Sequence, residues 1–258
     1  MIVVDKLSRS LIFRGFRKML AAEFVDSEAS QIWQEANSHL LDLERKHPDI
    51  TGDNKMMILP SATFYLALRD HSPEQALPLL RSYGTKMGNK IAGVVHAITS
   101  IPGVSMLMWR NAPKLMRNSS SPKKGYTRRI VSETDALVGV DILSCPLHDA
   151  AVKIGVPEAA LMVCAMDKAY MSGFKYIRYT RTTSVAEGDE HCDYRLSYDH
   201  SKTLKRKSRS RFYSEAFLLW DTRRFLTGEI SFWQKYNKLQ IKERFYFYDI
   251  SNHYGCNR

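Results

Sequence analysis

The sequence changes character at one point, and this change limits the folds that the chain can adopt. Up to about residue 117, apolar residues recur three and four positions apart, which places them on one face of a helix. The polar, turn-forming segment RNSSSPKKG, residues 117–125, interrupts this pattern. After it, short β-branched runs such as YTRRIV and ALVGVDIL are typical of strands. The sequence therefore predicts an α+β fold, in which a helical N-terminal layer packs on a small, mainly antiparallel sheet.

Three regions follow from this change, and we expect them to form one integrated domain. They are a helical N-terminal region over residues 1–117, an α+β core over residues 126–199, and a basic, aromatic-rich C-terminal extension over residues 200–258. Within the core, CPLHDAAVKIG and PEAALMVCAMDKAYMSG have the composition of helices, and YIRYTRTT and HCDYRLSY have that of strands. With 258 residues, of which 44% are hydrophobic, the chain can bury a sizeable core.

One apolar segment raises the question of a membrane span. Residues 91–109 form a run of 19 residues without a formal charge, which is close to the length that crosses a bilayer. The run also contains His96 and, near its middle, a Pro102-Gly103 pair of the kind that breaks helices. We therefore expect a buried helix that ends or bends at this pair, and no membrane insertion.

The cysteines and the N-terminus bear on the cellular compartment. Four cysteines, at positions 145, 164, 192 and 256, are too few and too scattered for a secreted disulfide scaffold. In the first 20 residues, Asp5 and several basic side chains interrupt the apolar core that a signal peptide needs. These features predict a cytoplasmic protein with reduced thiols.

The net charge of +11 would suit a nucleic acid or an anionic surface as partner. The excess is concentrated in KKGYTRR, residues 123–129, and in KTLKRKSRSR, residues 202–211. Such runs are typical of solvated loops, and no helix-turn-helix, RNA-recognition or zinc-finger pattern accompanies them. Nucleic-acid binding is therefore the lesser alternative, and a small molecule is the expected partner.

The helix that begins near Pro157 carries a cysteine and a carboxylate on one face. Cys164 and Asp167 are three residues apart, and their face also bears apolar residues one turn to either side. A carboxylate on a buried face is costly unless it is paired or protonated. Asp167 is thus either a site residue or a residue at the rim of the core that reaches water.

The two late strands place a second group of side chains on inward faces. Alternation puts Tyr179 and Arg181 on one face of YIRYTRTT, and Cys192 and Tyr194 on the inward face of HCDYRLSY. His191 then lies on the opposite face, which excludes a direct pair of His191 with Cys192. Symmetric pairing around a hairpin loop over residues 184–189 predicts that Arg181 lies opposite Cys192. A guanidinium in that place lowers the pKa of the thiol or binds a substrate carboxylate.

The motifs of this region resemble those of a known family. Cys145-Pro146 is followed by a helical Cys164-x-x-Asp167, by Arg181-Thr182, and by Glu-Gly-Asp-x-x-Cys-Asp-Tyr over residues 187–194. Over about residues 130–199 this order resembles the L-2-amino-thiazoline-4-carboxylic acid hydrolase family. Tyr194 stands where members typically carry Phe, and the segment after residue 200 departs from the family, since most members stop soon after this strand.

The resemblance implies the hydrolytic opening of a cyclic C–N bond in a small, carboxylate-bearing heterocycle. In the mechanism that we favour, Cys192 attacks the ring carbon as a thiolate, Arg181 holds the carboxylate, and Asp167 transfers protons to the departing nitrogen. Cys164 and His148 are further catalytic candidates. The expected pocket is completed by Cys145, Tyr179 and Tyr194. His148 follows Cys145 by three residues and is a candidate base. The alternative, that it is an exposed loop or helix histidine without a catalytic role, stays open.

Other uses of the same residues stay open. The three thiols with Asp167 or His148 could bind zinc, although their spacing is not that of a zinc motif, and our primary expectation is no cofactor. All three cysteines could instead be ordinary core residues. A ligand-binding domain without turnover, or a biosynthetic ring-modifying enzyme, would use the same pocket. The sequence leaves the oligomeric state open, a homodimer included.

Overall fold

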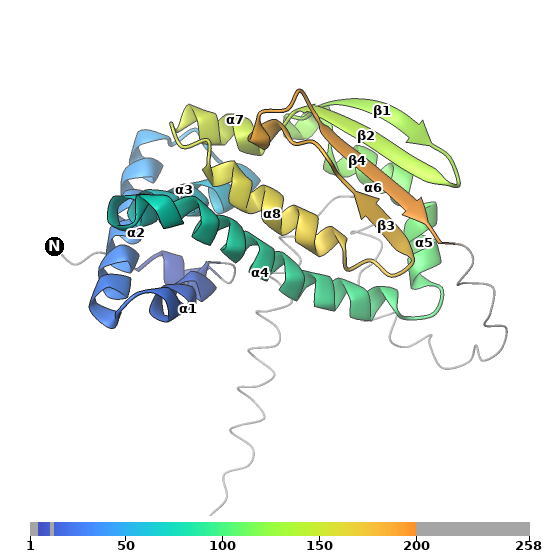
Figure 1. Cartoon of the computed structure of the whole chain (residues 1–258). Helices are drawn as coiled ribbons and strands as arrows, with labels where there is room; N and C mark the ends of the chain where they lie inside the picture. Colours follow the sequence, from blue (N-terminus) through green and yellow to red (C-terminus); the bar gives the residue numbers. More distant parts are fainter. Residues whose placement is uncertain (1–4, 11–12, 200–258) are drawn as a thin grey trace, which may run out of the picture. The chain divides into compact units, whose positions relative to one another are not determined.

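A four-stranded sheet and the helices on one of its faces make up the part of the chain that carries the predicted site (Figure 1). The structure, a computed structural model, describes residues 5–10 and 13–199, which belong to one compact unit. The predicted extension over residues 200–258, with its basic run and Cys256, lies outside the described residues. The described part is mainly helical with one antiparallel sheet, so the prediction of an α+β fold is confirmed.

The strands of the sheet lie in the order β1-β2-β4-β3, and all neighbours are antiparallel. Their bounds are Thr127–Glu133 for β1, Leu137–Ser144 for β2, Ile177–Thr180 for β3 and Cys192–Tyr198 for β4. One face of β2 and β4, with Val138, Val140 and Leu196, is buried against helices. This alternation confirms that Cys192 belongs to the inward face of β4, because Cys192 is buried with Val140.

The helices precede and interrupt the sheet. Within the described residues they are α1 (Arg14–Glu23), α2 (Asp26–Lys46), α3 (Gly52–His71), α4 (Pro73–Thr99), α5 (Val104–Arg110), α6 (Ala112–Ser119), α7 (Pro146–Lys153) and α8 (Ala159–Met171). Short 3-10 turns are η1 (Leu7–Arg9), η2 (Pro122–Lys124) and η3 (Val185–Glu187). The core of the N-terminal layer is aromatic, and the rings of Phe16 and Phe64 stack at 3.7 Å between centroids.

The long helix α4 packs closely against α8, which carries two of the predicted site residues (Figure 1). Two glycines of α4 make this possible. A Cβ atom on Gly84 would lie 2.2 Å from the carbonyl oxygen of Met162, and one on Gly88 would lie 2.3 Å from that of Met166. Any larger residue would push the helices apart, so the two glycines set the position of α8 relative to α4.

The apolar run over residues 91–109 is divided between two helices. α4 ends at Thr99, and α5 begins after Gly103, whose φ of 87° only glycine adopts readily. The break predicted at Pro102-Gly103 is therefore confirmed. In residues 5–10 and 13–199, no single helix is long and apolar enough to cross a membrane, and α4 and α5 meet that test only as a pair bent by 104°.

Candidate active site

The hairpin of β3 and β4 pairs in a different register from the predicted one. Thr180 pairs with Arg195, and β3 ends there, so the inward neighbour of Arg181 is Tyr194 and not Cys192. The predicted pairing of Arg181 with Cys192 was wrong by two residues. Because side chains alternate with a period of two, this shift leaves each of them on its predicted face.

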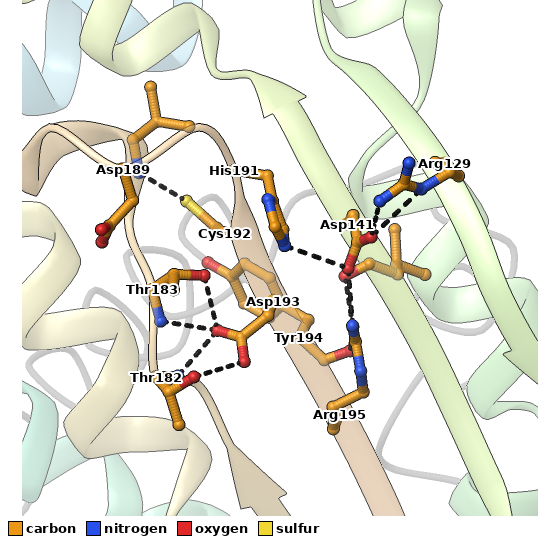
Figure 2. A network of polar contacts seen from close by, with 12 residues as sticks. Arg129, Asp141, Thr182, Thr183, Asp189, His191, Cys192, Asp193, Tyr194 and Arg195 are labelled. Carbon is orange, nitrogen blue, oxygen red and sulfur yellow. Dashed lines mark hydrogen bonds and ion pairs between the residues drawn. The ribbon is translucent and has the colours of Figure 1, made fainter.

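Cys192 begins β4 and points toward the loop that precedes it (Figure 2). Its residue is 5% exposed, and its sulfur accepts a hydrogen bond from the backbone N–H of Val185 at 3.3 Å. The hydroxyl of Ser184 lies 3.9 Å from the same sulfur. Cys192 is thus held by the turn that contains Ser184 and Val185.

Ser184 connects Cys192 with a second thiol. Its hydroxyl also lies 3.8 Å from the sulfur of Cys164 on α8, and Ser184 is only 1% exposed. Two thiols from different elements therefore share one buried hydroxyl. Ser184 was not among the predicted site residues, because the sequence placed it in a hairpin loop, and its contacts with the two sulfurs appear only in the structure.

Cys145 lies at the beginning of α7 and packs in the apolar cluster that contains Cys192. Burial raises the pKa of Cys145 to about 11, although the nearby backbone N–H groups of His148 and Leu147 act in the opposite direction. Burial likewise raises the pKa of Cys164 to about 12, against the effect of the Arg181 charge. Both groups therefore remain protonated thiols near neutral pH.

Arg181 is buried at 8% exposure and forms the centre of a polar network. Its guanidinium donates to a carboxylate oxygen of Asp167 at 3.4 Å, to the hydroxyl of Tyr194 at 3.1 Å and to the backbone carbonyl of Cys164 at 3.0 Å. Desolvation disfavours its charge, but Tyr194, Tyr179 and Asp167 raise the pKa of Arg181, so it stays cationic. The inward position predicted for Arg181 is confirmed.

Two opposing effects act on the pKa of the Asp167 carboxyl group. Burial raises the pKa of Asp167 above its ordinary value. The charge of Arg181 and the hydroxyl of Tyr194, which donates a hydrogen bond at 2.8 Å, partly oppose this rise. Burial has the larger effect, so the carboxyl group holds its proton to a higher pH than an exposed aspartate does. A carboxyl group of this kind can donate a proton to a substrate.

The remaining predicted residues differ in how close they come to the thiols. The ring of Tyr179 lies 5.7 Å from that of Tyr194, and its buried hydroxyl has no hydrogen-bond partner within the described residues. The ring of His148 is nearest to its neighbour, with Nδ1 at 4.0 Å from a carboxylate oxygen of Asp149. No contact among the described residues joins that ring to Cys145 or to another thiol. The geometry thus favours Tyr179 over His148 as a site residue.

Asp193 fixes the loop that carries Arg181 and Ser184. Its carboxylate accepts hydrogen bonds from the N–H and hydroxyl groups of Thr182, both at 2.7 Å, and from those of Thr183 at 2.7 and 3.0 Å (Figure 2). Desolvation tends to raise the pKa of Asp193, but these hydrogen bonds outweigh it and lower the pKa. Asp193 was not among the predicted site residues, because alternation along the strand directs its side chain away from the core.

The outer face of the sheet carries a second polar cluster, centred on Asp141 of β2 (Figure 2). Asp141 is 2% exposed and accepts hydrogen bonds from Arg129 and Arg195, both at 2.7 Å. His191 lies on this face too, with Nε2 at 3.8 Å from an Asp141 oxygen. The prediction that His191 and Cys192 do not form a pair is therefore confirmed.

A groove between α4 and α8 exposes one of the three thiols, that of Cys164. Its volume is about 410 Å³. The charged and reactive residues in its wall are Arg81, Cys164, Lys168, Arg181 and Glu187. An ion pair between Arg81 and Glu187, at 3.2 Å, connects α4 to the turn η3. Neither Cys192 nor Cys145 is part of the wall, and Cys192 is connected to the wall residue Cys164 through the hydroxyl of Ser184.

The zinc alternative requires the three thiols to converge with Asp167 or His148. Within residues 5–10 and 13–199, no group of three or more His, Cys, Asp or Glu side chains is arranged to hold a metal ion. The three cysteines of this part of the chain are free thiols. The contacts that the thiols make are instead with a hydroxyl, with backbone N–H groups and with apolar side chains.

Comparison with known proteins supports the resemblance seen in the motifs. The family model described as L-2-amino-thiazoline-4-carboxylic acid hydrolase matches residues 54–196, which is just over half of the 258 residues. The match begins in α3 and ends in β4, so it includes the α4–α8 contact, the three thiols of the described residues and nearly all of the region of about 130–199. No curated protein and no solved structure matches the chain. The chain therefore belongs to the L-2-amino-thiazoline-4-carboxylic acid hydrolase family.

Proposed function

We propose that this protein is a cysteine-dependent hydrolase that opens a C–N bond in a small, carboxylate-bearing heterocycle of the 2-amino-thiazoline-4-carboxylate type. One observation carries the proposal. The thiols of Cys164 and Cys192 lie within 4 Å of the Ser184 hydroxyl, and Arg181, which is paired with Asp167, donates a hydrogen bond to the backbone carbonyl of Cys164. A nucleophile, a proton donor and a cation for a carboxylate are thus adjacent.

Cys192 is the proposed nucleophile. The N–H group of Val185 is directed at its sulfur, whereas burial keeps Cys145 and Cys164 protonated near neutral pH. In the first step, the Cys192 thiolate adds to the amidine carbon of the ring, and the C–N bond breaks as the nitrogen takes up a proton. In the second step, water attacks the same carbon, the C–S bond to Cys192 breaks, and the thiol is restored. One water molecule is consumed in total.

Asp167 and Arg181 act as a linked pair in this proposal. Because burial raises its pKa, Asp167 can hold the proton that passes to the departing nitrogen. Arg181 loses its anionic partner when Asp167 is protonated, and the substrate carboxylate then takes that place in a two-pronged contact. The hydroxyl of Tyr179, which has no hydrogen-bond partner among the described residues, is available to bind a polar atom of the ring.

The direct test is incubation with 2-amino-thiazoline-4-carboxylate, followed by mass spectrometry. We expect a product heavier by one water molecule with the wild type and none with Cys192→Ala, while Cys145→Ala retains activity. Since the amidine carbon also carries a ring sulfur, a thiol reagent identifies the broken bond. C–N opening leaves a free amine, whereas a free thiol in the product would reassign the departing atom. Full turnover by Cys192→Ala would refute the nucleophile.

A ligand-binding domain without turnover is the second candidate. One observation favours it: the guanidinium of Arg181 is already bound to Asp167, Tyr194 and Cys164, which is typical of a rigid, preformed site. This candidate predicts saturable binding of the thiazoline by calorimetry with no product by mass spectrometry. Product formation at a rate that depends on Cys192 would exclude it.

A further inference from the structure

The groove between α4 and α8 has one helix in each wall. Arg81 and Thr85 lie four residues apart and therefore on one face of α4. On α8, Cys164 and Lys168 have the same spacing, so the ammonium group of Lys168 lies one turn from the Cys164 thiol. Arg181 is the most deeply buried charge in the groove. Lys168 is exposed, whereas Cys164 is partly buried and Arg181 is buried, so Lys168 is the most accessible of these three groove residues.

The wall of the groove carries more positive than negative side chains among the described residues. Arg81, Lys168 and Arg181 are cationic, and Glu187 is the one anion in its wall among the described residues. Arg181 is paired with Asp167, and Arg81 with Glu187. Lys168 makes no ion pair or hydrogen bond in the described part of the chain. It is thus the cation that an incoming anion can bind without first breaking another contact.

We propose that this groove is the substrate entrance and that Lys168 is a specificity-determining residue, which binds the carboxylate of the incoming heterocycle before Arg181 receives it. This inference rests on the proposed function and adds the recognition of negative charge at a defined position. A groove lined by cations raises the local concentration of anions and their rate of entry. A neutral or cationic heterocycle of the same size gains nothing from Lys168.

The ion pair of Arg81 with Glu187 lies in the wall of the same groove. Glu187 belongs to η3, the turn that begins at Val185 beside Cys192. Both partners are partly exposed, and such pairs contribute little to stability, so the pair can open as a ligand passes. Arg81→Glu would place two anions at the entrance and slow the entry of a carboxylate. The charge swap Arg81→Glu with Glu187→Arg restores the pair and is the matched control.

The first experiment measures the entrance without turnover. Wild-type protein is treated at mildly alkaline pH with anionic and cationic methanethiosulfonates of equal size, and modification of Cys164 is followed by peptide mass spectrometry. Cys145, which does not line the groove, is the internal reference. We expect the anionic reagent to modify Cys164 about tenfold faster than the cationic one, and Lys168→Glu to reverse this order. Equal rates in both proteins would overturn the inference.

The second experiment uses the reaction. Lys168→Gln should raise the KM for the carboxylate substrate about tenfold, leave kcat unchanged, and leave the KM for the carboxamide analogue unchanged. Lys90→Gln, which removes an exposed lysine of α4 outside the groove, should change neither constant. An equal loss with both substrates would contradict the role of Lys168. If no heterocycle is turned over, but the anionic reagent still modifies Cys164 faster and Lys168→Glu reverses this order, the role of the groove is supported and only the proposed reaction is refuted.

Discussion

The hydroxyl of Tyr194 donates a hydrogen bond of 2.8 Å to the carboxylate of Asp167. This contact connects β4, the strand that begins with Cys192, to α8, the helix that carries Cys164. It also favours the charged form of Asp167, so it opposes the effect of burial on the pKa of that carboxyl group. The proton donor of the proposed reaction is therefore adjusted by a side chain from the same strand as the nucleophile.

Tyr194→Phe tests this adjustment. Loss of the hydrogen bond should raise the pKa of Asp167 further, because the charged form loses a donor. Activity that requires the protonated acid falls as the pH rises through its pKa, so the alkaline limb of the pH–rate profile should move to higher pH. Tyr198→Phe removes a hydroxyl from the same face of β4 and serves as the control. An unchanged limb, or one moved to lower pH, would show that Asp167 is not the titrating acid.

Asp193→Asn tests how much the hydrogen bonds from Thr182 and Thr183 to the Asp193 carboxylate stabilise the protein. An amide offers one acceptor oxygen where the carboxylate accepts four hydrogen bonds, and we expect the free energy of unfolding to fall by about 1–3 kcal/mol at neutral pH. The pKa of Asp193 is lower in the folded state, so its contribution is present above the unfolded value of about 3.9 and is lost as the pH falls through the folded value.

Urea unfolding of Asp193→Asn and the wild type across this pH range is the measurement. The difference between the two proteins should be constant near neutral pH and should shrink in acid. A difference that is independent of pH down to strong acid would mean that the carboxylate charge contributes nothing. Iodoacetamide labelling of Cys192 should also accelerate in the variant, because the turn that covers the thiol is released.

Labelling with iodoacetamide at several pH values, followed by peptide mass spectrometry, compares the reactivity of the individual cysteines. With pKa values of about 11 and about 12, Cys145 and Cys164 should react slowly at neutral pH. Their rates should rise roughly tenfold for each pH unit until those values are reached, since only the thiolate reacts. Cys192, if it is the nucleophile, should be modified before both. Fast labelling of Cys164 at neutral pH would contradict the assignment of the nucleophile.

A pair of glycine substitutions tests the contact that positions α8. Gly84→Ala puts a methyl group 2.2 Å from the Met162 carbonyl and should destabilise the protein by about 1–3 kcal/mol. Gly93→Ala, in the same helix with open space around it, should stabilise by up to about 1 kcal/mol. Thermal unfolding compares the two. Equal effects would mean that the close approach of α4 and α8 is not required.

Local periodicity predicted much of the site, and long-range geometry accounts for what it missed. The inward faces of β4 and α8 follow from spacings of two and three residues, so Cys192 and Arg181 were correctly placed on buried faces. The strand register was not predictable from symmetric pairing, because the hydrogen bonds from Thr182 and Thr183 to Asp193 end β3 early. This lengthens the connection to β4 beyond the short hairpin loop that we expected.

Other features depend on contacts that no single segment reveals. Ser184 reads as a turn residue, and its position between two thiols exists only when α8 and β4 are both in place. The groove likewise requires α4, which ends about 60 residues before α8 begins. The two helices approach closely at glycines of α4, and the importance of these glycines is visible only when the packing of α8 is known. Sequence patterns therefore placed these residues on their faces but did not predict the groove beside them.

Asp193 and Cys192 are neighbours in the chain and belong to opposite sides of one strand. Asp193, on the side away from the helices, holds the loop whose end contacts the sulfur of Cys192 on the other side. The outer surface is thus connected to the Cys192 sulfur through the short segment from Thr183 to Val185. Substitutions in this loop therefore change the surroundings of the Cys192 sulfur without replacing any residue on the inward face of β4.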